Sequence, residues 1–119
     1  MKRIYALRIA AVLLVIAAPS TTAAVPRLVG TTGPGFTITL KRNGVKVRTL
    51  KPGRYTLVVA DKSSAHNFRL KGPGLNRAVT SVGFTGTKRV TVTLRVGKYT
   101  YQCDPHVLGG MRGTFRVTS

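Results

Sequence analysis

The sequence contains very few of the residues that build disulfides, carboxylate pairs or multinuclear metal centres. Among 119 residues there are one cysteine, two histidines and two acidic residues. Apart from Met1 there is one methionine, Met111. A single cysteine excludes a disulfide within the chain. The few residues with chemically active side chains therefore carry most of the information about function.

The chain also has no apolar run long enough to cross a membrane, which takes about 20 residues. Three basic residues precede residue 9, ten apolar residues follow (Ile9 to Ala18), and small residues (Thr22 to Ala24) stand before Val25. This pattern predicts a secretory signal peptide over residues 1–24, cleaved before Val25. The protein is then periplasmic or secreted, with no stable membrane insertion after cleavage. An uncleaved membrane anchor is the alternative.

Acidic residues are almost absent. After residue 24 there remain 17 of the 20 lysines and arginines against Asp61 and Asp104, a net charge of +15. So strong a positive field favours an acidic partner. The basic residues are scattered singly, with no dense run, so specific binding of nucleic acid is not expected.

Residues 25–119 are enough for one domain and too few for two. Apolar and polar residues alternate along 36–41, 90–96, 99–103 and 115–118, which indicates strands with one buried face. Asn43-Gly44 is a typical two-residue hairpin turn. Short strands without a helical period predict an all-β domain of two packed antiparallel sheets, or a small barrel. We favour the sandwich, with Phe36, Ile38 and Leu40 on its inner face.

The segment from Cys103 to Met111 collects most of the chain's metal-binding side chains. Alternation directs Cys103 inward at the end of a strand, Pro105 ends that strand, and Gly109-Gly110 allows the loop to close so that His106 and Met111 approach the thiol. In an exported protein a lone cysteine is an intermolecular bridge, a reactive thiol or a metal ligand. With His66 as the fourth donor, the set matches one type 1 copper ion, in which two imidazoles and a thiolate form a plane below a weak axial methionine.

At these residues the chain resembles the cupredoxins, in particular plastocyanin, pseudoazurin and amicyanin. Their ligand loop, Cys-x-x-His-x-x-x-x-Met, is matched by Cys103, His106 and Met111, and the asparagine that commonly follows their upstream histidine is matched by Asn67. The resemblance, from about residue 35 to 118, implies an eight-stranded Greek-key β-sandwich. It implies that the Asn67 side chain ties the ligand loops together and its N–H donates to the Cys103 sulfur. It also implies that His106 lies nearest the surface, as the electron port.

The chain departs from plant plastocyanins, which have an exposed tyrosine before the ligand cysteine and acidic patches. Gln102 stands at that position here, and the surface charge is basic. We therefore expect an apolar patch around His106, formed by Pro105, Leu108 and the two glycines, with charges such as Arg112 at its rim. Such a patch suits brief encounters with an acidic redox partner by a monomeric protein.

A one-electron carrier cycling between Cu(I) and Cu(II) is the function that the sequence favours. Two alternatives stay open: a module for copper storage or delivery, and a basic secreted binding domain. Enzymatic activity is not expected, because oxidases and nitrite reductases need further copper centres with more histidines. Asp104, the carboxylate nearest to the predicted ligands, is expected to bind the loop backbone rather than to act in catalysis.

Overall fold

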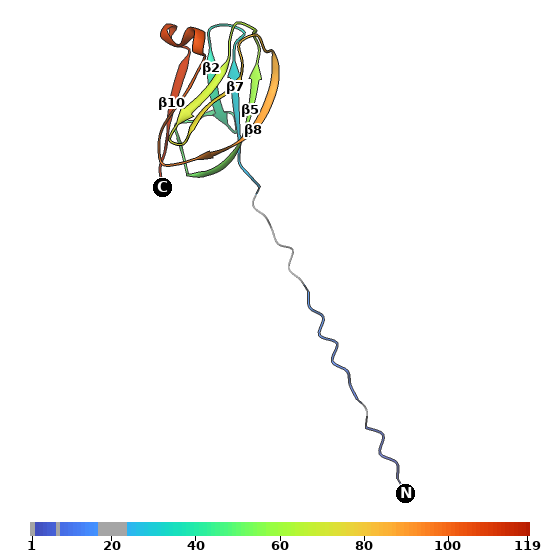
Figure 1. Cartoon of the computed structure of the whole chain (residues 1–119). Coiled ribbons are helices and arrows are strands. Elements are labelled where there is room, and N and C mark those ends of the chain that lie inside the picture. The colour runs from blue at the N-terminus through green and yellow to red at the C-terminus, as the bar shows by residue number, and fades with distance from the viewer. Residues whose placement is uncertain (1, 7, 17–23) are drawn as a thin grey trace.

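The computed structural model describes residues 2–6, 8–16 and 24–119. The described residues before 17 form neither helix nor strand, and they extend away from the folded domain (Figure 1). The predicted cleavage site includes residues 22 and 23, which lie outside the described residues, so the signal peptide stays a prediction. No helix in the described ranges is both long and apolar enough to span a bilayer.

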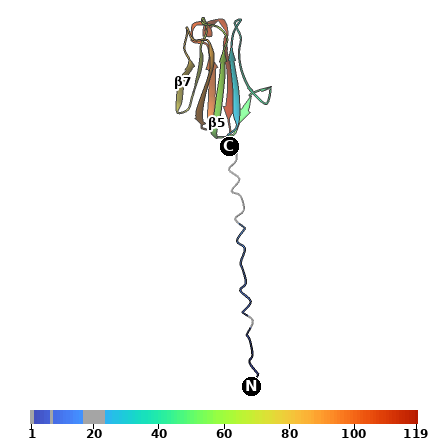
Figure 2. The same cartoon turned by 90° about the vertical axis from the view of Figure 1, so that its right-hand side faces the viewer.

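Two five-stranded sheets pack face to face (Figure 2). In spatial order, the first contains β3 (Val45–Lys46), β2 (Ile38–Arg42), β1 (Arg27–Thr32), β5 (Gly53–Asp61) and β8 (Gly86–Leu94). The second contains β4 (Thr49–Leu50), β10 (Arg112–Val117), β9 (Gly97–Gln102), β6 (Phe68–Gly72) and β7 (Leu75–Thr80). A short 3₁₀ helix, η1 (Asp104–Gly109), joins β9 to β10 at the end of the sandwich opposite the C-terminus (Figure 1).

The predicted β-sandwich is confirmed, with eight strands of five or more residues and two of only two residues in the described part of the chain. The prediction of purely antiparallel sheets is wrong. β1 pairs with β5 in parallel, and β4 pairs with β10 in parallel. Alternation along a strand reports which face is buried, but it carries no information about which strand lies alongside.

The interior between the sheets is apolar, as the alternation predicted. Its largest side chains include Leu28, Leu40, Leu57, Phe68, Tyr99, Tyr101 and Phe115. Two predicted inner residues are exceptions: Phe36 is 74% exposed and Val96 is 58% exposed. Both lie beyond the strand to which alternation assigned them, because β2 begins at Ile38 and β8 ends at Leu94.

The strand β9, which leads to the predicted ligand Cys103, is held in place by two tyrosine rings that pack closely over glycines of its neighbouring strands. A Cβ added at Gly113 would clash with the Tyr101 ring, and one added at Gly72 would clash with the Tyr99 ring. Because β9 lies between β6 and β10, each neighbouring strand contributes a glycine under one tyrosine. These contacts restrict the position of β9 just before Cys103. The turn at Asn43-Gly44 is also as predicted, with φ of 50° and 76°.

Candidate metal centre

Cys103 continues β9 by one residue beyond its last ladder pair. Its φ of −97° and ψ of 115° are extended, so the thiol lies on the same inner face as Tyr99 and Tyr101. The residue is fully buried. The sequence-based prediction that alternation delivers the thiol into the interior is confirmed.

The loop after Cys103 closes through backbone hydrogen bonds. The His106 N–H donates to the Cys103 carbonyl (3.1 Å), and the Met111 N–H donates to the His106 carbonyl (3.2 Å). The Cys103 N–H in turn donates to the Met111 carbonyl (3.0 Å). Gly110 takes a left-handed conformation with φ of 95°, which suits glycine, so the predicted role of the glycines in closing the loop is confirmed at this position. The 3₁₀ helix within the loop was not predicted.

His66 reaches the same end of the sandwich from the second sheet. It stands two residues before β6, in a turn in which its N–H donates to the Ser63 carbonyl (3.1 Å). β6 pairs directly with β9, with Arg69 opposite Gln102. This register places the residues preceding β6 beside the residues following β9. His66, 37 positions from Cys103, thus becomes its neighbour, and only 2% of it is exposed.

Three donor atoms converge at this point. The His66 and His106 Nδ1 atoms are 3.0 Å apart, and they lie 3.6 and 3.4 Å from the Cys103 Sγ. A point equidistant from all three lies about 1.9 Å from each, close to the metal–nitrogen and metal–sulfur bond lengths of about 2.0–2.3 Å seen in zinc sites. The chain therefore holds a thiolate and two imidazoles where one metal ion can contact all of them.

Met111 is 2% exposed and follows directly after the loop. Its backbone bonds to both Cys103 and His106, as described above, set its Cα beside theirs. Of the four predicted donors, His106 alone is partly exposed, and the other three are buried. The expectation that His106 lies nearest the surface agrees with this order of exposure.

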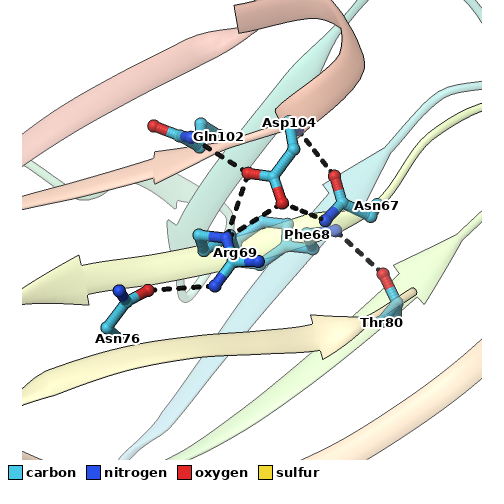
Figure 3. A network of polar contacts seen from close by, with 7 residues as sticks. All are labelled: Asn67, Phe68, Arg69, Asn76, Thr80, Gln102 and Asp104. Atoms are coloured by element: carbon cyan, nitrogen blue, oxygen red, sulfur yellow. Dashed lines mark hydrogen bonds and ion pairs between the residues drawn. The ribbon is translucent and has the colours of Figure 1, made fainter. Parts of the chain in front are cut away.

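A polar network around Asn67 and Asp104, which directly follow His66 and Cys103 in the chain, joins the two loops that carry the donors (Figure 3). The Asn67 amide donates to Asp104 Oδ2 (2.9 Å), and the Asp104 N–H donates to Asn67 Oδ1 (2.7 Å). The predicted tie through the Asn67 side chain is confirmed. Its predicted N–H to sulfur contact stays a prediction.

Asp104 is the centre of this network (Figure 3). Besides the Asn67 amide, its carboxylate accepts from Arg69 Nε (2.9 and 3.0 Å) and from Gln102 Nε2 (3.0 Å). Partial burial tends to raise the pKa of Asp104, but the hydrogen bonds from Gln102, Asn67 and Arg69 outweigh it and hold the pKa below its ordinary value. Asp104 was expected to bind loop backbone, and instead its carboxylate binds three side chains. Gln102, at the position of the exposed tyrosine in plant plastocyanins, is buried.

Phe36 is a residue of the site that sequence reasoning missed. Its ring lies edge-on to both imidazoles, with centroids 5.7 Å from that of His66 and 5.0 Å from that of His106. It comes from the loop between β1 and β2, where alternation had placed it on an inner strand face. Its place beside Gly33-Pro34-Gly35, a turn signal, could have shown that it precedes the strand.

A β-sandwich with two imidazoles and a thiolate at one end defines a type 1 copper protein, because these soft and borderline donors in a near-trigonal set suit copper. The family of copper-binding proteins that includes plastocyanin and azurin matches residues 31–118, and the chain belongs to this family. The protein is a blue copper electron carrier, and the donor atoms of His66, Cys103 and His106 lie close enough together to hold one metal ion.

Solved structures agree on the fold. Reduced auracyanin from the photosynthetic bacterium Roseiflexus castenholzii is 19% identical with a TM-score of 0.59, over 81% of this chain and 99% of that one. Rusticyanin from Thiobacillus ferrooxidans is 25% identical with a TM-score of 0.50, over 77% and 76%. A multi-copper oxidase from Pediococcus acidilactici is 16% identical with a TM-score of 0.53, over 87% of this chain but 28% of that one. None of the curated proteins matches the sequence significantly.

Proposed function

We propose that His66, Cys103, His106 and Met111 together would hold the single copper ion, with the Met111 thioether as the weakest of the four donors. The convergence of three donor atoms within 3.6 Å of one another is the observation that carries this proposal. Bound copper supplies a one-electron couple between Cu(I) and Cu(II). The two loops that carry the donors are joined by Asn67 and Asp104, which holds the donors in one geometry and limits rearrangement between the two oxidation states.

Electrons enter and leave at the end of the sandwich that carries His106. This imidazole is the one predicted ligand that is partly exposed, and two exposed apolar side chains, Leu108 and Phe36, lie at the same end of the sandwich. Leu108 is fully exposed, and Phe36 is 74% exposed while contacting both imidazoles. An exposed apolar surface next to a partly exposed ligand permits close approach of a partner without a strongly bound complex.

The partner is an acidic redox protein that binds transiently, and the carrier acts as a monomer outside the cytoplasm without an enzymatic activity of its own. The net charge of +15 after residue 24 supports the choice of partner, and the signal-like segment supports the location. Mass spectrometry of the exported protein should find Val25 or a close neighbour at the N-terminus. Recovery of residues 1–24 in a membrane fraction would support an anchor instead.

The test of the copper site is a visible and EPR spectrum of the purified protein with Cu(II). An intense blue colour is expected, and a colourless Cu(II) complex would overturn the proposal.

The test of the role is kinetic. Replacing Leu108 with Glu should slow electron exchange with an acidic partner and leave the spectrum unchanged, because Leu108 lies on the surface and binds no metal. A storage or delivery protein would instead pass copper to an acceptor, with electron exchange indifferent to Leu108 and to salt.

A further inference from the structure

A groove of about 690 Å³ on the outer face of the second sheet is lined by five basic side chains. They come from three stretches of chain, namely the segment 46–48, β9 and β10: Lys46, Arg48, Lys98, Arg112 and Arg116. All five are exposed. No acidic residue lines the groove.

Strand register explains why these charges gather. Lys98 on β9 stands directly opposite Arg116 on β10, and the Arg116 N–H donates to the Arg48 carbonyl (3.0 Å). Like charges directly opposite one another destabilise an antiparallel pair. Few acidic side chains are available to balance these positive charges. Asp61 is buried, and the one side-chain ion pair among the described residues joins Arg69 to Asp104. The groove therefore keeps an unbalanced positive charge that folding alone does not favour.

The groove begins beside the metal centre. Arg112 directly follows Met111 and pairs with Gln102, the residue before Cys103. From Arg112 to Arg116 the groove follows β10 for about 13 Å, at roughly 3.3 Å per residue. A molecule lying in it has one end next to the surface around His106. The short distance from the groove to His106 gives no advantage to a bound anionic polymer. It does favour a bound protein that exchanges electrons at His106.

We propose that this groove is the docking site for an acidic segment of the redox partner, which it orients so that the partner's redox centre faces His106. The inference rests on the proposed function and adds to it the surface and the orientation. Five cations in a shallow open groove suit an extended acidic segment with several carboxylates better than one small anion. Binding of this kind weakens with salt, because exposed charges are screened beyond about 8 Å at physiological ionic strength.

The experiment uses hexaglutamate as the acidic probe, free and coupled to a ruthenium tris-bipyridine photoreductant. Two double variants with the same loss of two positive charges are compared: Lys98→Gln with Arg116→Gln in the groove, and Lys88→Gln with Arg89→Gln at exposed positions of the first sheet. Free hexaglutamate is titrated into the ¹⁵N-labelled Cu(I) protein. The coupled probe, once photoexcited, passes one electron to Cu(II), which gives Ru(III) and Cu(I).

On addition of hexaglutamate we expect NMR chemical-shift changes at backbone amides along β9 and β10. The affinity for hexaglutamate should be about fivefold lower in the groove variant than in the first-sheet variant. At low salt, the rate at which the coupled probe reduces Cu(II) should also be lower in the groove variant than in the first-sheet variant. Equal weakening in both variants, or shifts on another face, would show that only net charge matters and would overturn the proposal. Polyphosphate of equal charge that binds the groove more than tenfold more tightly would identify an anionic polymer as the occupant. The blue spectrum is recorded separately, so a failed copper site and a failed docking site are distinguishable.

Discussion

Replacing Asn67 with Ala tests whether the Asn67–Asp104 pair holds the two ligand loops together. The change removes the amide that donates to Asp104 Oδ2 (2.9 Å) and the oxygen that accepts from the Asp104 N–H (2.7 Å). Asn67 is 3% exposed, so water cannot easily replace the lost amide. The Asp104 side chain is 34% exposed, and solvent can partly satisfy its carboxylate.

The expected cost follows from these two bonds. A neutral hydrogen bond contributes about 0.5–1.5 kcal/mol and one to a charged group about 1.5–3 kcal/mol. Because Asp104 is partly solvated, we take the lower end for the charged bond, which gives a total of about 2–3 kcal/mol. For a domain of this size, each kcal/mol lowers the melting temperature by about 4–8 °C. The variant should therefore melt roughly 10–20 °C lower.

The assay is thermal and urea unfolding of the metal-free protein, so that copper binding does not contribute to the difference. Asn76→Ala is the matched control, because Asn76 is exposed and its amide oxygen accepts from Arg69 (3.0 Å). That control should change stability by less than about 0.5 kcal/mol. If the two variants lose the same stability, or Asn67→Ala loses less than about 0.5 kcal/mol, the pair does not hold the loops and the reasoning is refuted.

Four further substitutions and one control have defined outcomes. Cys103→Ser should abolish the blue colour, as measured by visible spectroscopy, and retained colour in this variant would exclude the thiolate as a ligand. Met111→Leu should keep the colour and shift the reduction potential, as measured by voltammetry. Phe36→Ala should lower the reduction potential by about 20–60 mV, because water admitted at the two imidazoles stabilises the more highly charged Cu(II) form. An unchanged potential would show that the Phe36 ring does not shield the imidazoles from water. Gly113→Ala should destabilise the domain by about 1–3 kcal/mol in urea unfolding, since its Cβ would meet the Tyr101 ring. Gly35→Ala is the control and should not destabilise it, because there is open space around the added Cβ. Equal losses of stability in the two variants would count against the packing of Tyr101 over Gly113.

Much of the site could be predicted because its chemistry is concentrated in a few rare residues. With one cysteine, two histidines and one internal methionine, the donors could be named without any knowledge of contacts. Strand alternation also placed Cys103 on the inner face, and the order of exposure among the predicted ligands agreed with expectation. The contact between His66 and the loop, 37 residues apart, was expected only because one copper site needs all four donors, since no local rule brings distant strands together.

By itself, then, the sequence determined the candidate donor set, most of the buried positions on the strands that it predicted and the excess of positive charge, since these depend on residue type and a two-residue period. Only the tertiary structure decided the parallel pairing of β1 with β5, the contact of Phe36 with both imidazoles and the gathering of scattered cations into one groove. Lys98 and Arg116 are 18 positions apart and become neighbours through the register of β9 and β10. Register depends on how two whole sheets pack, and a pattern read along a single strand does not contain it.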